Sequence, residues 1–312
     1  MRFLSWLRER NGDRSSKSAR PVRSKSRPAR RVRLGVEALE DRCVPSTVTV
    51  LNNQDSGIDS LRADIATAQN GDTIVFASSL AGQTITLTSG ELLVNKNLTI
   101  QGLGASQLTI SGDNLSRVFE VANGKKGPTQ FALSGLTISN GVGVAAAGSS
   151  KSTDGSGGGI LVDAGAALTV NNSTLSGNKA NIGGGIFNST GTVMVTGCIL
   201  SSNSALNGDG GGIRNGGGTL TVTGSTLSGN TAKNSGGGIF SQGTLTVSGS
   251  TLSSNSSHNG GGIFFGGIGT AMVSDSTLTG NTATYAGFYR LAALFRAGYF
   301  DDRHQRLRIV SC

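Results

Sequence analysis

The amino-acid sequence predicts an all-β protein: a right-handed parallel β-helix solenoid of about nine or ten coils with a short N-terminal capping helix. Three observations predict this fold. Gly supplies 49 of the 312 residues and Pro only 4, and only 14% of the residues are charged. The tetrad Gly-Gly-Gly-Ile recurs at intervals of about 25 residues, and a period of this length is typical of solenoids. Several other residue types keep the same spacing.

Four columns of identical residues define the repeat. They are Ile160, Ile186, Ile213, Ile239 and Ile263; Val170, Val195, Val222, Val247 and Val273; Leu175, Leu200, Leu227, Leu252 and Leu278; and Asn178, Asn203, Asn230, Asn255 and Asn281. The segment from Val to Asn keeps one length in every repeat, so insertions collect near the Gly run, where we expect a loop. Each repeat holds three short β-prone pieces bounded by Gly, Ser or Asn.

No single repeat could bury its own apolar face. Stacking the coils about 4.8 Å apart would place Ile on Ile, Val on Val and Leu on Leu. The Asn column would then form a structural ladder of side-chain amides along the axis.

The residues before the regular repeats continue the pattern less evenly. We expect strands at 73–76, 83–88, 98–100, 108–110, 118–121 and 136–138, and a loop insertion at 141–156, which is rich in Gly, Ala and Ser. Ser60, followed by Leu61, Ile65 and Ala68, predicts a capped helix of about ten residues. Its expected role is to cover the open edge of the first coil.

Charge divides the chain into three parts: a basic leader with a sorting-like segment at 1–46, the β-helix at 47–285, and an aberrant basic tail at 286–312. Residues 1–43 carry 13 Lys or Arg and 5 acids, and 286–312 carry 5 Arg and 2 acids. The remaining body is nearly neutral, so the net charge of +9 does not indicate nucleic-acid binding. The leader also offers only Phe3 and Trp6 for stacking on bases.

The tail breaks the repeat where the next Gly-Gly-Gly-Ile is due. One interpretation is a cap, because Phe288, Leu291, Ala292 and Phe295 have helical spacing. The other is a reading frame lost in mid-repeat, which further Gly-Gly-Gly-Ile codons in another frame of the downstream DNA would reveal. No apolar run is long enough for a transmembrane helix.

Three segments resemble known families. Asp55-Ser56-Gly57, Ser60-Leu61-Arg62 and residues 70–76 resemble the opening of bacterial surface right-handed parallel β-helix proteins. The Gly-Gly-Gly-Ile-Phe and Ser-Gly-Asn units resemble repeats of the chlamydial polymorphic outer-membrane protein family, and both belong with the pectin-lyase-like fold. Residues 39–46 resemble the N-terminal LEPR-xLL segment of planctomycete extracellular proteins, with Asp41 in place of Pro. These resemblances imply an extracellular location or one at the cell envelope or outer-membrane surface.

The weak catalytic candidates are Asp154 and Asp209, which lie 55 residues apart, close to two coils. Carboxylates one or two coils apart would match the separations of glycosidase pairs. Both residues lie in Gly-rich turns, where Asp commonly stabilises the turn. His258 has no neighbours for a triad or metal site, so we expect neither cofactor nor metal.

Five further residues carry expectations about their exposure or role. Arg214 follows a Gly-Gly-Gly-Ile where other coils carry Phe187, Phe240 and Phe264, and we expect it to be exposed. The Phe residues form either an outward sticky stripe or a second buried column. Cys198 occupies a column of serines, which indicates a small-residue substitution and not a nucleophile.

The sequence therefore predicts an exported structural or adhesive protein with no evident catalytic site. Its expected partners are polysaccharide or other cell-surface components, and the oligomeric state stays open. One alternative is a polysaccharide lyase or hydrolase of pectin-lyase-like fold. The other is a truncated, non-functional fragment of a larger surface protein.

Overall fold

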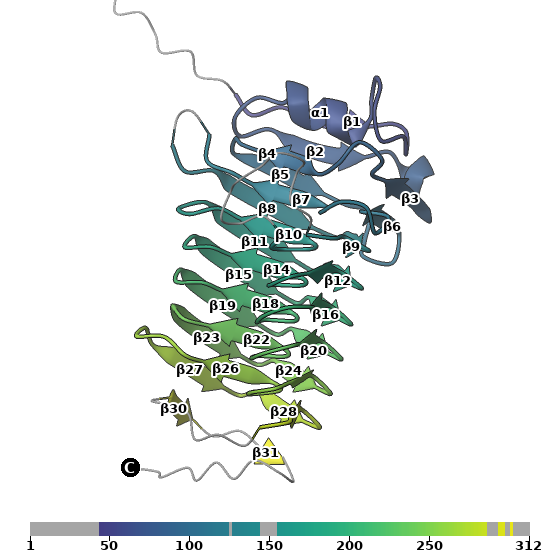
Figure 1. Cartoon of the computed structure of the whole chain (residues 1–312). Helices are drawn as coiled ribbons and strands as arrows, with labels where there is room; N and C mark the ends of the chain where they lie inside the picture. Colours follow the sequence, from purple (N-terminus) through teal and green to yellow (C-terminus); the bar gives the residue numbers. More distant parts are fainter. Residues whose placement is uncertain (1–43, 125–126, 144–154, 286–292, 297–299, 302–312) are drawn as a thin grey trace, which may run out of the picture. The chain divides into compact units, whose positions relative to one another are not determined.

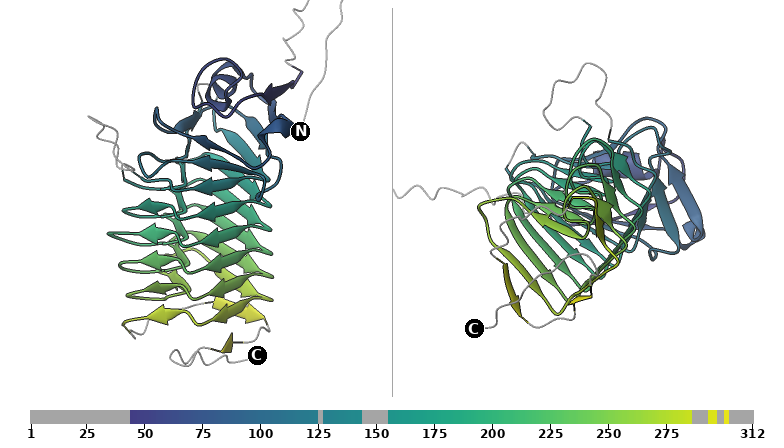
Figure 2. Two further views of the ribbon diagram at one scale, coloured as in Figure 1. Left: turned by 90° about the vertical axis from the view of Figure 1, so that its right-hand side faces the viewer. Right: turned by 60° about the horizontal axis from the view of Figure 1, so that its bottom comes forward.

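The structure, a computed structural model, describes residues 44–124, 127–143, 155–285, 293–296 and 300–301, the last two segments by their backbone alone. The described residues form an all-β parallel solenoid of about nine turns, which confirms the predicted fold class. Figure 1 shows the coils following one another from α1 (Leu61–Thr67) to the last described strands. In the left view of Figure 2 the strands of successive coils lie beneath one another.

Four parallel sheets run along the stack. Sheet A contains β1 (Thr47–Val50), β2 (Thr73–Phe76), β5 (Leu98–Gln101), β8 (Gln130–Ser134), β11 (Ala167–Asn171), β15 (Thr192–Thr196), β19 (Thr219–Thr223), β23 (Thr244–Ser248), β27 (Ala271–Ser274) and β30 (Ala293–Arg296). Sheet B contains β3 (Gln83–Thr86), β6 (Leu108–Ser111), β9 (Thr137–Ser139), β12 (Thr174–Ser176), β16 (Ile199–Ser201), β20 (Thr226–Ser228), β24 (Thr251–Ser253), β28 (Thr277–Thr279) and β31 (Phe300–Asp301).

The other two sheets are smaller. Sheet C contains β4 (Leu92–Val94), β7 (Phe119–Val121), β10 (Ile160–Val162), β14 (Ile186–Asn188), β18 (Ile213–Asn215), β22 (Ile239–Ser241) and β26 (Ile263–Phe265). A five-stranded sheet contains β13 (Lys179–Ala180), β17 (Ser204–Ala205), β21 (Thr231–Ala232), β25 (Ser256–Ser257) and β29 (Thr282–Ala283). A regular coil passes through sheet C, sheet A, sheet B and the five-stranded sheet in that order.

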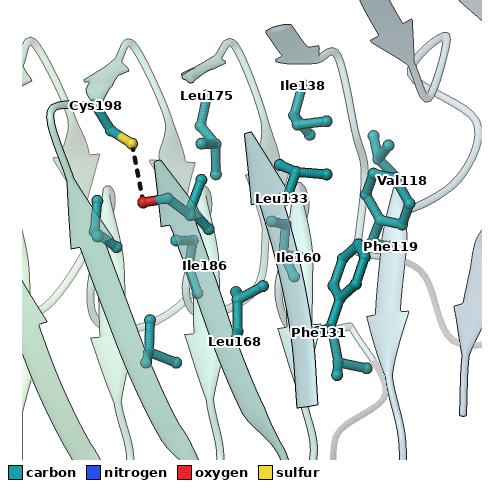
Figure 3. Packing of buried hydrophobic residues seen from close by; sticks show 14 of the residues in the cluster. Val118, Phe119, Phe131, Leu133, Ile138, Ile160, Leu168, Leu175, Ile186 and Cys198 are labelled. Atoms are coloured by element: carbon teal, nitrogen blue, oxygen red, sulfur yellow. Dashed lines mark hydrogen bonds between the residues drawn. The ribbon is translucent and has the colours of Figure 1, made fainter. Parts of the chain in front are cut away.

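The register of the sheets stacks identical residues, as the repeat predicts. Val170 pairs with Val195, and Val195 pairs with Val222. In sheet B, Leu175 pairs with Leu200. These inward side chains are buried and form one continuous core, part of which Figure 3 shows from Phe119 and Phe131 to Cys198. The apolar side chains of one coil are covered by those of the coils before and after it, so the core forms only when the coils stack.

The Gly run is required by the close approach of successive coils. The first Gly of each run adopts a left-handed conformation, as Gly183 does with φ +64°. A Cβ on Gly185 would lie 2.5 Å from the backbone oxygen of Gly212 in the next coil. A side chain at this position would therefore push the coils apart.

The predicted helix is present near the first coil. Ser60 caps α1 by accepting a hydrogen bond from the Ala63 N–H at 3.3 Å. Leu61 and Ile65 are buried in the same core as Val50 of β1. A short 3-10 helix, Ser78–Leu80, follows β2. The helix thus extends the apolar core toward the first strand of sheet A.

Some elements differ from the sequence predictions. Strands β1, β4 and β8 were absent from the predicted set, and the regular coils contain four strands instead of three. Phe295 lies in β30, which pairs with β27, so the helical cap proposed for the tail is wrong at this residue. Phe288, Leu291 and Ala292, and the leader up to residue 43, lie outside the described residues.

Candidate functional site

The five predicted ladder asparagines are joined by hydrogen bonds through the interior. The Asn203 N–H and its Nδ2 both donate to Oδ1 of Asn230, each at 3.0 Å. The same pattern joins Asn178 to Asn203, Asn230 to Asn255, and Asn255 to Asn281. Each Nδ2 also donates to a leucine or isoleucine carbonyl of the preceding coil. The ladder therefore satisfies buried polar groups and leaves none of its amides for a ligand.

A second polar ladder lies inside sheet C, and the sequence analysis missed it. The Asn188 Nδ2 donates to Oδ1 of Asn215 at 2.8 Å, and Nδ2 of Asn215 donates to Ser241 Oγ at 3.0 Å. All three side chains are fully buried. The available signal was an Asn two residues after the Gly-Gly-Gly-Ile in two successive coils.

A third ladder uses serine hydroxyls at the turn between sheets A and B. The backbone N–H of Ser225 donates to Ser250 Oγ, and that of Ser250 donates to Ser276 Oγ, each at 3.1 Å. Cys198 occupies one position of this column and is buried, with its thiol 3.3 Å from the Thr196 carbonyl oxygen. Burial raises the pKa of this thiol. These contacts fit a small-residue substitution and do not make Cys198 a nucleophile.

Of the two candidate acids, only Asp209 lies in the described part of the chain. Asp154 lies outside the described residues. Asp209 lies 3.9 Å from Nε of Arg214, measured to Oδ2. Burial raises the pKa of Asp209, although Arg214 and Ser235 act in the opposite direction. Among the residues described around it, Asp209 is therefore paired with one arginine and has no second carboxylate beside it.

Arg214 is not exposed, contrary to the sequence prediction. Only 17% of its side chain is accessible, and its guanidinium lies between the rings of Phe187 and Phe240, at 5.2 and 5.3 Å from their centroids. Phe240 continues the stack onto Phe264, with ring centroids 5.4 Å apart. Phe187 and Phe240 are each only 6% exposed, so the buried column, and not the sticky stripe, is correct for these two residues.

An ionic cluster that the sequence analysis missed joins two of the irregular coils. Arg117 forms a salt bridge with Glu91 and lies 3.5 Å from Glu120, measured from Nη1 to Oε2. Burial raises the pKa of Glu91 to about 7, and a hydrogen bond to Glu120 adds to the effect, while Arg117 opposes it. The two carboxyl groups therefore share a proton near neutral pH.

Arg117 is also anchored to the chain that follows. Its Nε donates to the carbonyl oxygens of Ser156 and Gly157 at 3.1 and 3.0 Å, and its Nη2 donates to that of Ser156 at 2.9 Å. The side chains of Arg117 and Glu120 are only 5% and 6% exposed, whereas that of Glu91 is 31% exposed. A substrate would reach only one carboxylate of this pair. The cluster thus resembles a structural clamp more than a glycosidase pair, whose carboxyl groups stand about 5–9.5 Å apart.

The outer side of sheet B carries two columns that consist almost entirely of Thr and Ser, and we name it the hydroxyl face. On each strand from β3 to β28 two residues flank the inward Ile or Leu, and all of them except the buried Ser111 and Ser139 are at least partly exposed. One column consists of Thr84, Thr109, Thr137, Thr174, Ile199, Thr226, Thr251 and Thr277. The other consists of Thr86, Ser111, Ser139, Ser176, Ser201, Ser228, Ser253 and Thr279. Ile199 is the sole member of the hydroxyl face without a hydroxyl group.

No protein-family model and no curated protein matches the chain. Within the described part of the chain, no three His, Cys, Asp or Glu side chains gather as a metal site would require. In the same residues, no helix is long and apolar enough to cross a bilayer. The chemistry that bears on function therefore lies in the surface and the buried clusters of the solenoid itself.

Proposed function

We propose that this solenoid is an exported structural or adhesive protein of the cell envelope or the extracellular space, and that it binds polysaccharide or other cell-surface components. A parallel β-solenoid fits a structural or surface protein. The hydroxyl face is the observation that carries the adhesive role, because it offers aligned hydrogen-bonding groups on eight consecutive strands. Export is supported by the resemblance of residues 39–46 and of the repeats to families of surface proteins.

Binding without turnover is the expected behaviour. In the ionic cluster the pKa of Glu91 is raised to about 7. Its partner Glu120 is buried, however, and Arg117 forms an ion pair with both acids. Asp209 has a basic partner and no neighbouring acid among the residues described around it. The hydrogen-bonded Glu91–Glu120 pair does not provide the separated carboxylates and intervening water that an inverting hydrolase needs.

The test uses the full-length protein in a binding and turnover screen. Depletion from solution by insoluble polysaccharides would measure binding, and release of reducing ends or unsaturated products, with and without calcium, would measure turnover. Binding without product release supports the proposal. Product release that is lost in Glu91→Gln or Asp209→Asn would instead make the protein a lyase or hydrolase. Retention of a tagged chain inside cells of an exporting host would overturn the proposed location.

A further inference from the structure

An Asn-Gly pair can modify itself without an enzyme. The backbone nitrogen of the glycine attacks the side-chain carbonyl carbon of the asparagine, and a glycine has no side chain to screen that nitrogen. The described part of the chain contains six such pairs, which begin at Asn70, Asn123, Asn140, Asn207, Asn215 and Asn259. Four of these asparagines are exposed, namely Asn70, Asn123, Asn140 and Asn207. Exposure alone therefore does not single out one pair.

Three of the four exposed pairs are protected by a hydrogen bond from the glycine N–H. The bonds are Gly71 N–H to the Asn97 carbonyl oxygen at 2.7 Å, Gly124 N–H to the Gly127 carbonyl oxygen at 3.1 Å, and Gly141 N–H to Asn178 Oδ1 at 2.8 Å. A hydrogen-bonded amide is available for reaction only after the structure around it has opened. In the folded protein these three glycine nitrogens are therefore poor nucleophiles.

Gly208, in the fourth pair, is different. Its N–H donates no hydrogen bond to any residue that the structure describes. The Asn207 N–H donates to the Asn181 carbonyl oxygen of the preceding coil at 3.2 Å, and the Asn234 N–H of the following coil donates to the Gly208 carbonyl oxygen at 3.0 Å. The backbone on both sides of this amide is thus bonded to neighbouring coils, whereas the amide itself is not.

The length of the repeat explains the unpaired amide. In three coils the connection from the ladder Asn to the next Gly run contains four or five residues, at 179–182, 231–235 and 256–259. In the coil of β17 the connection contains six residues, at 204–209, and Asn207 and Gly208 lie within it. Because both neighbouring coils are shorter here, they do not provide a partner for every amide of the longer connection.

We propose that Asn207 deamidates spontaneously in the folded protein. The Gly208 nitrogen forms a bond to Cγ of Asn207, the bond from Cγ to Nδ2 breaks, and Nδ2 leaves as ammonia with the proton of the Gly208 amide. One water molecule then cleaves the bond from the Gly208 nitrogen to one of the two carbonyl carbons of the cyclic imide. The products are aspartate and isoaspartate at position 207, and the reaction needs no oxidant, reductant or cofactor.

The unpaired amide also favours ring closure. Gly208 is buried, so its donor without a partner raises the free energy of the native state. The cyclic imide has no N–H, and its formation at Gly208 removes this unsatisfied donor. At the three protected pairs, ring closure would instead destroy a hydrogen bond.

The products would alter contacts between coils. The Asn207 Nδ2 donates to Asn181 Oδ1 at 2.6 Å, and a carboxylate has no proton for this bond. Isoaspartate also adds a methylene group to the backbone between the two bonds that join Asn207 and Gly208 to opposite neighbours. The new negative charge lies two residues before Asp209, the carboxyl partner of Arg214.

The experiment incubates the full-length protein in mildly alkaline buffer, with and without urea, and follows each Asn-Gly peptide by mass spectrometry. Deamidation is recognised by the mass difference between a hydroxyl and an amino group. Asn70, Asn123 and Asn140 are internal controls, because they are also exposed and followed by glycine. Urea removes the hydrogen bonds of the fold, so all four peptides should react within about two-fold of one another there.

In the native protein we expect Asn207 to react at least about five-fold faster than each control, because only the controls must first break a hydrogen bond. Asn207→Gln should abolish the main acidic isoform that accumulates with time, whereas Asn70→Gln should leave it. Equal native rates at the four positions, or a faster rate at a control, would overturn the proposal. The same preference for Asn207 in urea would also overturn it, since the fold would then not be the cause. So would an unmodified native Asn207 after the time in which it reacts completely in urea.

Discussion

Asn203 and Asn230 share one oxygen atom: Oδ1 of Asn230 accepts both the backbone N–H and the side-chain Nδ2 of Asn203, each at 3.0 Å. Asn230 in turn donates from its Nδ2 to the Leu200 carbonyl oxygen at 2.9 Å. One side chain thus satisfies three buried polar groups of the preceding coil. Both asparagines are fully buried, so water cannot replace these bonds.

Asn230→Ala should therefore be strongly destabilising. It removes the acceptor of the Asn203 N–H and of one Asn203 Nδ2 hydrogen, and it removes a donor to the Leu200 carbonyl oxygen. Because an unsatisfied buried group costs about 1–3 kcal/mol, we predict a loss of about 3 kcal/mol or more. Urea denaturation monitored by circular dichroism would measure the loss. Asn234→Ala is the matched control, because Asn234 is exposed and the hydrogen bond that its side chain donates is a long one, from Nδ2 to the Asn207 carbonyl oxygen at 3.4 Å. Similar losses in the two variants would contradict the structural role of the ladder.

Cys198 is expected to be replaceable by serine at little cost. The backbone N–H of Cys198 already donates to Ser225 Oγ at 3.1 Å, and Ser225 and Ser250 continue the same ladder. Cys198→Ser would extend the hydroxyl column, so we expect a stability change within about 1 kcal/mol, whereas Cys198→Leu would overpack the turn and cost about 1–3 kcal/mol. Equal effects of the two substitutions would contradict the ladder at this position.

The same thiol should react slowly in the native protein. Cys198 is only 1% exposed and burial raises its pKa, so the thiolate that a disulfide reagent needs is scarce and inaccessible. Its rate of reaction should rise steeply once urea unfolds the chain. Reaction of this cysteine in the folded state at the rate found in urea would show that the turn is open. Cys198→Ser identifies the part of the signal that comes from Cys43 and Cys312.

The periodicity of the sequence was sufficient to predict which residues stack. Val170, Leu175 and Asn178 belong to columns in which each coil must present the same residue to the next, so one period specifies both the strands and their register. The five-stranded sheet could not be predicted in this way. Its strands, such as β13 and β17, are two residues long and contain Lys, Ser and Ala, which carry no pattern of alternation.

The ionic cluster was beyond the sequence analysis for a different reason. Glu91 and Arg117 lie 26 residues apart, about one coil, but in the irregular coils where no repeated column specifies the register. The exposure of Arg214 was misjudged because a charged residue was assumed to face water. Its neighbours in the column are Phe187 and Phe240, and two aromatic rings provide a favourable site for a guanidinium.

The Arg214 stack leads to a prediction about stability. Arg214→Ala removes two cation–π contacts and the packing of the arginine stem, and we expect a loss of about 1–3 kcal/mol. Burial lowers the pKa of Arg214, which reflects the cost of keeping its charge between the rings. Replacing the charged pair by Arg214→Phe with Asp209→Ser should restore the stability or exceed it, because well-packed apolar groups avoid that cost. A double variant as unstable as Arg214→Ala would contradict this account of the column.

The carboxyl pair Glu91 and Glu120 predicts how the stability depends on pH. The pKa of Glu91 is raised from 4.5 to about 7, so the folded state binds more protons than the unfolded state between these values. The stability that the shared proton provides is complete below about pH 4.5 and is lost as the pH rises through about 7. Urea midpoints of the wild type should therefore fall between about pH 5.5 and pH 8. Glu91→Gln should reduce the fall of the urea midpoint with pH, because the amide keeps a hydrogen-bond donor toward Glu120 at every pH. The control variant Asp113→Asn, at an exposed turn with φ +54°, should not alter the pH dependence of the midpoint. An equally steep fall in Glu91→Gln would show that the proton is bound elsewhere.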